Sequence, residues 1–196
     1  MSSTNRGNSR DFHVADYYVT PIKSIVDFLM EFFDDNPNLD FNGKTILDPC
    51  AGGDDKHPMS YPEAIKKWEF TNQPIIRTID LRQDSKAEIK ENYLFKQLDY
   101  QPDVIITNPP FMTAREIIGK ALNDVKDGGL VIMLLRLNFF GSRARFSFWE
   151  KNMPTFCYVH NERIGFTDNE TTDSIEYMHA VWIKGEHPKF TKLRVI

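Results

Sequence analysis

Four consecutive residues, Asn108-Pro109-Pro110-Phe111, combine groups that could do chemistry on an amino group. The Asn108 amide oxygen and the Pro109 carbonyl can together accept both hydrogens of one amino nitrogen. The Phe111 ring can stack on the face of a planar base. The tetrapeptide therefore predicts a site that holds an exocyclic amino group beside an aromatic ring.

The residues before this tetrapeptide predict the element that positions it. Residues 104–107, which follow Asp103, form an apolar, β-branched run that is typical of a buried strand. Proline lacks an N–H and has a fixed φ, so Pro109 and Pro110 cannot continue a ladder of hydrogen bonds. The strand must end here, and this places Asn108 at a rigid tip.

Strand and helix patterns alternate from residue 45 to residue 137, which predicts crossover units and a parallel sheet. Two later strand patterns, at 178–183 and 189–196, have no clear helix between them and predict an antiparallel hairpin at one sheet edge. We therefore expect an α/β protein with a mostly parallel, twisted sheet of about seven strands. Thr20 is expected to cap the first helix. The expected helices cover 21–33, 61–69, 86–92 and 114–126, and the other expected strands cover 45–48, 73–80, 94–100, 103–107 and 130–137.

Polar residues end four of these strand patterns: Asp48, Asp80, Asp99 and Asn108. In an open parallel sheet, ligands bind outside the carboxyl ends of the strands. The four side chains are therefore expected to face one crevice.

The first of these acids begins a glycine-bearing turn, Asp48-Pro49-Cys50-Ala51-Gly52-Gly53. Glycine lets a backbone approach a ligand closely. The turn has neither the Gly-x-Gly-x-x-Gly spacing of dinucleotide sites nor the Gly-Lys-Ser/Thr ending of a P-loop. Its ligand is therefore expected to present no phosphate to the loop.

Together with Tyr18-Val19-Thr20-Pro21, these segments resemble the motifs of S-adenosylmethionine-dependent DNA N6-adenine methyltransferases of the Asn-Pro-Pro-Phe type, in compact phage or prokaryotic form. The resemblance covers residues 18–138. It implies a Rossmann-like methyltransferase fold, with S-adenosyl-L-methionine as cofactor. It further implies that Thr20 meets the methionine end of the cofactor, Asp80 the ribose hydroxyls and Asp99 the adenine amino group. The implied cofactor-binding residues are Tyr18, Thr20, Pro21, Asp48, Pro49, Cys50, Ala51, Gly52, Gly53, Asp80, Leu81, Asp99, Tyr100 and Asn108, and the implied catalytic residues are Asn108, Pro109, Pro110 and Phe111.

The reaction that the resemblance implies is methyl transfer to N6 of adenine in DNA. Asn108 and Pro109 would accept the two N6 hydrogens, so that the nitrogen lone pair becomes localised and attacks the sulfonium methyl in line. Such catalysis is mainly positioning and electrostatics. An adenine in duplex DNA must first leave the base stack, and Phe111 would then stack on it.

Three alternatives share part of this pattern. RNA adenine or protein glutamine could be the methyl acceptor, because enzymes acting on them share the Asn-Pro-Pro tip. The Thr-Pro element and Phe111 favour DNA. The chain could also be an inactive methyltransferase-like protein that binds nucleic acid or a catalytic partner. Its formal net charge of −4 and the lack of a recognition insert agree with this, whereas the intact tip argues against it.

A basic segment after the fifth strand pattern is the expected DNA contact. Arg136, Arg143 and Arg145 alternate there with aromatic residues, and cations interleaved with aromatics suit nucleic acid. The aromatic residues could equally form a helix packed on the sheet. For Arg143 and Arg145 we expect contacts with phosphate.

Length and composition set the remaining expectations. We expect a flexible N-terminal arm at 1–12 and a single methyltransferase domain at 13–196, without a separate target-recognition domain. Two cysteines without paired spacing predict a reduced, cytoplasmic protein, and the five histidines have no spacing typical of metal ligands. The sequence contains no apolar run long enough to span a bilayer.

Overall fold

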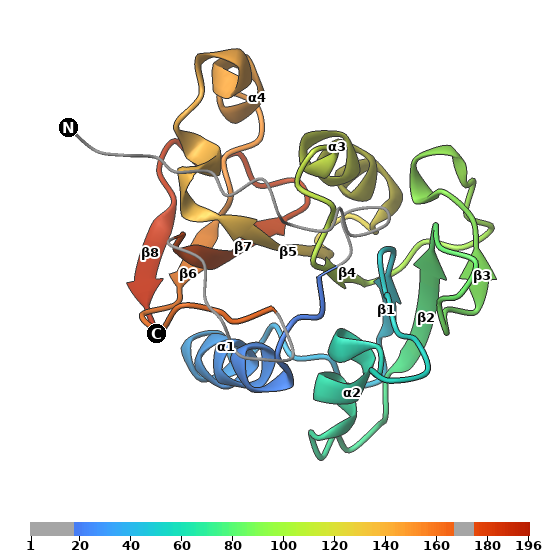
Figure 1. Cartoon of the computed structure of the whole chain (residues 1–196). Coiled ribbons are helices and arrows are strands. Elements are labelled where there is room, and N and C mark those ends of the chain that lie inside the picture. Colours follow the sequence, from blue (N-terminus) through green and yellow to red (C-terminus); the bar gives the residue numbers. More distant parts are fainter. Residues whose placement is uncertain (1–17, 167–174) are drawn as a thin grey trace.

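The computed structural model describes residues 18–166 and 175–196, so the expected arm at 1–12 lies outside the described residues. Within the described ranges the chain forms an eight-stranded sheet between two helical layers, with α1 and α2 on one face and α3 and α4 on the other (Figure 1). The helices are α1 (Ile22–Asp35), α2 (Ser60–Lys66), α3 (Ala114–Asp124) and α4 (Phe146–Trp149). The strands are β1 (Thr45–Asp48), β2 (Ile75–Asp80), β3 (Ile89–Lys90), β4 (Val104–Thr107), β5 (Leu130–Arg136), β6 (Phe156–Val159), β7 (Tyr177–Ile183) and β8 (Lys192–Val195).

The strand order is β3-β2-β1-β4-β5-β7-β6-β8. In this order, the first five strands, from β3 through β2, β1 and β4 to β5, pair in parallel. Strand β7 is antiparallel to both β5 and β6, and β8 is parallel to β6. The expected α/β class and the mostly parallel sheet with an antiparallel edge are therefore confirmed. The expected pairing of 178–183 with 189–196 is wrong, because β6 lies between β7 and β8. Six of the seven residues of β7 are buried, which suits a strand that has a partner on each side. All four residues of β8 are exposed, which suits the edge of the sheet.

Two expectations between β2 and β4 are wrong. The predicted helix at 86–92 contains instead the two-residue strand β3, which pairs with β2. The predicted strand at 94–100 begins as a short 3₁₀ helix, η2 (Tyr93–Phe95). Its Tyr93 is buried and its hydroxyl donates to Asp124 of α3 across 2.8 Å. Contacts distant in the sequence therefore override the local pattern here.

Helix α1 is amphipathic. Its buried residues are Ile25, Phe28, Leu29 and Phe32, whose spacing forms one stripe on the helix, and this stripe packs on the sheet. Thr20 does not cap the helix as expected, because Pro21 occupies the N-cap position without a side-chain hydrogen bond. The Thr20 side chain is thus available to the loops at the carboxyl ends of the strands.

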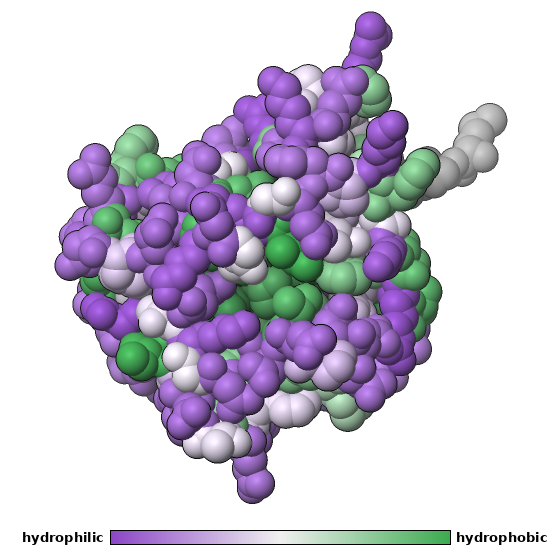
Figure 2. Space-filling model, turned by 180° about the vertical axis from the view of Figure 1, so that it is seen from behind, coloured by the Kyte–Doolittle hydropathy of each residue, from purple (hydrophilic) through white to green (hydrophobic). Residues whose placement is uncertain are grey.

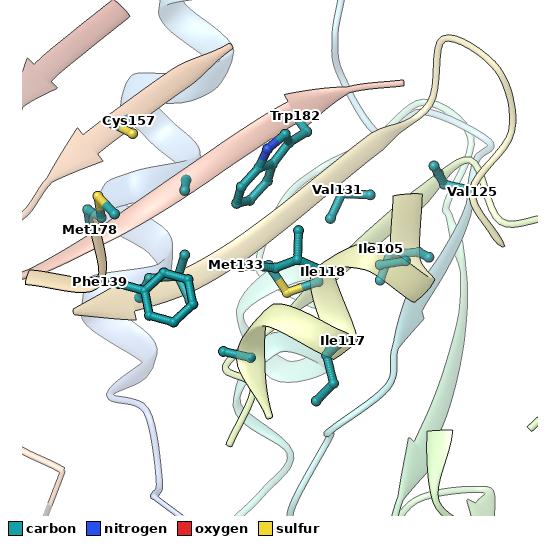
Figure 3. Packing of buried hydrophobic residues seen from close by; sticks show 14 of the residues in the cluster. Ile105, Ile117, Ile118, Val125, Val131, Met133, Phe139, Cys157, Met178 and Trp182 are labelled. Carbon is teal, nitrogen blue, oxygen red and sulfur yellow. The ribbon is translucent and has the colours of Figure 1, made fainter. Parts of the chain in front are cut away.

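Strand alternation divides the core into two layers. Ile105, Val131 and Met133 face α3 and pack with its Ile117 and Ile118 (Figure 3). Their neighbours along the strands face α1 and α2. Packing on both faces holds β4 at the centre of the sheet, and the residue that follows β4 is therefore held at a fixed position.

The face of the molecule opposite to that in Figure 1 is largely hydrophilic, with hydrophobic residues gathered near its middle (Figure 2). Among the described residues, no helix is long and apolar enough to cross a membrane. In the same residues, no group of three or more His, Cys, Asp or Glu side chains is arranged to hold a metal ion.

Candidate active site

A pocket of about 310 Å³ lies at the carboxyl ends of β1, β2 and β4. Its walls come from the segment before α1 and from the loops that follow these strands and β3. The sheet brings the pocket together because β2, β1 and β4 are neighbours and run in the same direction. The predicted residues that line it are Tyr18, Thr20, Pro49, Cys50, Ala51, Gly52, Gly53, Asp80, Leu81, Asn108 and Pro110. The predicted residues that do not line it are Pro21, Asp48, Asp99, Tyr100, Pro109 and Phe111.

Asn108 follows β4 directly and its side chain is held by Thr20. The amide nitrogen of Asn108 donates to the Thr20 hydroxyl across 3.1 Å. The amide oxygen is buried and has no hydrogen-bond partner among the described residues. A buried acceptor without a donor costs free energy, which a ligand that donates a hydrogen bond would recover. The oxygen therefore marks a donor-binding position in the pocket wall.

Asp48 ends β1 and is fully buried behind the pocket. One of its carboxyl oxygens, Oδ1, accepts from the Thr107 hydroxyl (2.6 Å) and from the Cys50 backbone N–H (3.2 Å). The other, Oδ2, has no partner among the described residues. Burial raises the pKa of Asp48 to about 7, and the charge of Asp80 acts in the same direction. A substantial fraction of Asp48 is therefore protonated at neutral pH.

Asp80 ends β2 and organises the glycine loop. Its Oδ2 accepts from the Gly52 backbone N–H (2.7 Å) and its Oδ1 from the Arg82 backbone N–H (2.8 Å). Gly52 and Gly53 have φ values of 64° and 75°, a conformation that favours glycine. A Cβ atom at Gly53 would lie 2.7 Å from the Met59 side chain. The absence of a side chain at Gly53 thus lets the loop pack against Met59, and both glycines also line the pocket.

The third expected acid lies elsewhere. Asp99 is exposed and does not line the pocket, because the strand that was expected to place it there does not form. From the segment after β3, Asn92, Tyr93 and Leu94 line the pocket instead. The Asn92 side chain caps η2 by accepting from the Leu94 N–H (3.0 Å). Asparagine before a short helical turn is the sequence signal that could have identified this segment.

Phe111 lies beside the pocket in a group of aromatic rings. Its ring centroid is 5.7 Å from that of Tyr18 and 6.1 Å from that of Tyr177. The guanidinium carbon of Arg136 lies 4.0 Å from the Phe111 centroid. One face of the ring is therefore covered by a cation, and Arg136 packs beneath the tip.

The two other predicted DNA-binding arginines differ from each other in the structure. Arg145 is half-buried, and its Nε donates to the Phe139 carbonyl across 2.7 Å. Its guanidinium carbon also lies 4.4 Å from the centre of the Phe139 ring. Arg143, at the start of the same 3₁₀ turn, is exposed. Only the Arg143 side chain is presented to solvent as the sequence suggested.

A row of neutral polar groups leads from the pocket wall, and its pattern is not visible in the sequence. The Tyr61 hydroxyl lies 3.0 Å from His179 Nε2, and His179 Nδ1 lies 2.8 Å from His160 Nε2. Burial lowers the pKa of His160 to about 4 and that of His179 well below its usual value. Each ring can donate to one neighbour and accept from another only while it is neutral.

Comparison with known proteins identifies the fold. No family model and no curated protein sequence matches the chain. A solved structure from Listeria monocytogenes, described as a class I S-adenosylmethionine-dependent methyltransferase, is similar with a TM-score of 0.67 at 14% identity. The match covers 92% of this chain but only 66% of that protein, so the chain spans slightly less than two thirds of its length.

Two further structures agree. One from Pyrococcus horikoshii, described as an RNA methyltransferase, has a TM-score of 0.61 at 15% identity, and the match covers 88% of this chain and 90% of that one. An S-adenosylmethionine-dependent O-methyltransferase from Thermotoga maritima has a TM-score of 0.53 at 10% identity, covering 84% and 67%. The chain therefore has the Rossmann-like methyltransferase fold.

Proposed function

We propose that this protein transfers a methyl group from S-adenosyl-L-methionine to the N6 amino group of adenine in DNA. The observation that carries the proposal is the buried Asn108 amide oxygen, which has no hydrogen-bond donor among the described residues and belongs to a residue that lines the pocket at the carboxyl edge of the sheet. The fold and the Asn-Pro-Pro-Phe tetrapeptide support it.

The pocket suits a cofactor that presents no phosphate. Its volume lies at the lower end of the range for small-molecule sites. The glycine loop beside it is fastened to Asp80, and Thr20 and Asn108 form the wall near the tip of β4. When bound, S-adenosyl-L-methionine supplies an electrophilic methyl group on a positively charged sulfonium. The Asp80 carboxylate in the pocket wall would favour a cationic ligand.

Asn108 and Pro109 act on the amino group. The Asn108 oxygen would accept one N6 hydrogen. The Pro109 carbonyl would accept the other, although Pro109 does not line the pocket in this structure. Two acceptors on one side of the nitrogen would favour a pyramidal geometry with a localised lone pair. In the transfer, the N–CH3 bond would form as the S–CH3 bond breaks, the demethylated cofactor would leave as a neutral thioether, and one N6 proton would pass to solvent. Thr20 contributes by holding the amide nitrogen, which fixes the orientation of the amide and leaves its oxygen as the acceptor. Catalysis in this arrangement comes from positioning.

The aromatic group beside the tip favours a base as the methyl acceptor. Phe111 and Tyr18 place rings next to the pocket, and stacking on such rings does not depend on the identity of the base. Because Arg136 covers one face of Phe111, the adenine would not stack on that face. The amino-group specificity would then come from Asn108.

The decisive experiment is mass spectrometry of nucleosides from digested DNA after incubation with the purified protein and the cofactor. The parent protein should form N6-methyladenine, and Asn108→Ala should lower the rate by about 10²–10³. Asn72→Ala, which removes an exposed amide far from the pocket, should match the parent. N6-methyladenine formed by Asn108→Ala at the parent rate would refute the site.

Parallel incubations identify the acceptor. Methylated adenine in RNA but not in DNA would overturn the DNA substrate while retaining amino-methyl transfer. If calorimetry detects binding of neither S-adenosyl-L-methionine nor its demethylated product, the entire proposal fails.

A further inference from the structure

The tip after β4 sends two neighbouring side chains in opposite directions. A hydrogen bond from the Thr113 N–H to the Pro110 carbonyl (3.1 Å) closes a turn. Within this turn Phe111 packs against Tyr18, whereas Met112 projects outward and is 90% exposed. The turn therefore presents a long apolar side chain to solvent immediately beside the proposed catalytic tip.

Met112 lies at the pocket and not at a random position on the surface. It lines the pocket together with Pro110 and Leu81, and Leu81 is 54% exposed. Exposed apolar residues gathered at a pocket mark a place where another molecule is bound. Phe95 is 83% exposed too, but it does not line the pocket.

A base that leaves a duplex creates an empty space in the stack. Opening that space costs a few kcal/mol for each disrupted base step, and proteins that distort DNA often fill it with an apolar side chain such as Met or Leu. Methionine suits this role because it is unbranched and flexible, and it can fill gaps of irregular shape.

We infer that Met112 enters the base stack of duplex DNA at the position that the target adenine vacates. The inference rests on the proposed function, because it requires that an adenine be bound at Asn108. Asn108 precedes the turn Pro110–Thr113 that carries Met112, and Asn108 and Met112 both line the pocket, so the side chain that projects from this turn lies next to the proposed path of the base. Leu81 lies on the loop that follows β2 and lines the same pocket.

The test compares methylation of one adenine-containing oligonucleotide as a single strand, as a duplex, and as a duplex with an abasic site opposite the target. Met112→Ala should lower the duplex rate about tenfold and the single-strand rate by no more than about twofold. The abasic site should restore most of the lost rate, since an unpaired base leaves the stack more easily. Phe95→Ala is the matched control and should resemble the parent on all three substrates.

A second measurement reports on extrusion directly. With 2-aminopurine at the target position, the parent should increase fluorescence on binding the duplex, and Met112→Ala should give a smaller increase. Equal rate losses on single-stranded and duplex DNA would show that Met112 supports the bound base or cofactor and does not fill the base stack, and would overturn the inference. Unchanged methylation rates on both substrates would also overturn the inference. Absence of methylation by the parent on every DNA substrate would instead refute the proposed function, and this inference with it.

Discussion

The Asn108 side-chain nitrogen donates a hydrogen bond to the Thr20 hydroxyl across 3.1 Å, although the two residues are 88 positions apart in the chain. This bond joins the segment before α1 to the tip of β4. It also decides which end of the Asn108 amide is left to accept a hydrogen bond, because the nitrogen is occupied and the oxygen has no partner among the described residues. The Thr-Pro element and the Asn-Pro-Pro-Phe tetrapeptide thus form one unit.

Thr20→Val should slow methyl transfer because it removes the acceptor that orients Asn108. The loss of one neutral hydrogen bond of about 1 kcal/mol corresponds to roughly a fivefold lower rate. Thr20→Ser keeps the hydroxyl and should remain close to the parent. Single-turnover rates at saturating cofactor measure this effect. Equal rates for the Val and Ser variants would show that the hydrogen bond does not orient the amide.

Asp80→Asn should weaken cofactor binding through the glycine loop. The substitution places an amide N–H₂ against one of the two backbone N–H donors, Gly52 and Arg82, that the carboxylate now accepts from. Leaving one donor unpaired costs about 1–3 kcal/mol. Calorimetric titration with the cofactor measures the loss. Asp55→Asn, a change at a fully exposed carboxylate, is the control and should leave the affinity unchanged.

The contribution of Asp48 to the free energy of unfolding should fall as the pH rises from about 4 to about 7. Burial raises the pKa of Asp48 from 3.8 to about 7, so in this range the folded protein binds a proton that the unfolded chain does not. The contribution of this group to the free energy of unfolding then falls by about 1.4 kcal/mol per pH unit. Asp48→Asn removes this dependence. The stability of the parent relative to the variant, from urea denaturation, should decline across this interval, and a constant difference would contradict the prediction.

His160 should have the opposite effect on the pH dependence of the free energy of unfolding. Burial lowers the pKa of His160 from 6.5 to about 4, so between these values the unfolded chain binds a proton that the folded protein does not. The free energy of unfolding should therefore fall as the pH drops from about 6.5 to about 4. Imidazole NMR signals provide the measurement, and His160 should remain neutral at pH 5.5. A charged His160 ring at that pH would contradict the lowered pKa.

Arg143→Ala and Arg145→Ala should have different effects. Arg143 is exposed, and its removal should lower the slope of log Kd against log salt for DNA by about one unit. Arg145 holds the Phe139 carbonyl and ring, so its removal should instead lower the free energy of unfolding by about 1 kcal/mol. Binding titrations at several salt concentrations and urea denaturation separate the two effects. Identical salt slopes for the parent and Arg143→Ala would remove Arg143 from the DNA contact.

Features that depend on residues adjacent in the sequence could be predicted without the structure. The β-branched run before Asn108 and the two prolines after it predict a strand with an abrupt end, because proline cannot continue the ladder whatever surrounds it. The apolar spacing of α1 and α3 and the alternation of elements predict crossover units and a parallel sheet. These signals placed Asp48, Asp80 and Asn108 at the ends of their strands.

Other features were decided by partners that are distant in the sequence. Strands as short as β3 and β6 leave no reliable periodicity, and they exist because β2 and β7 offer edges to pair with. Asp99 was misplaced for the same reason, since Tyr93 is held by Asp124 and its segment turns away from a strand. Residue types named Asn108 and Arg136 as candidates, and the resemblance to methyltransferase motifs named Thr20. Only the tertiary structure decided that Thr20 orients Asn108 and that Arg136 packs under Phe111, because side-chain partners depend on how distant segments meet.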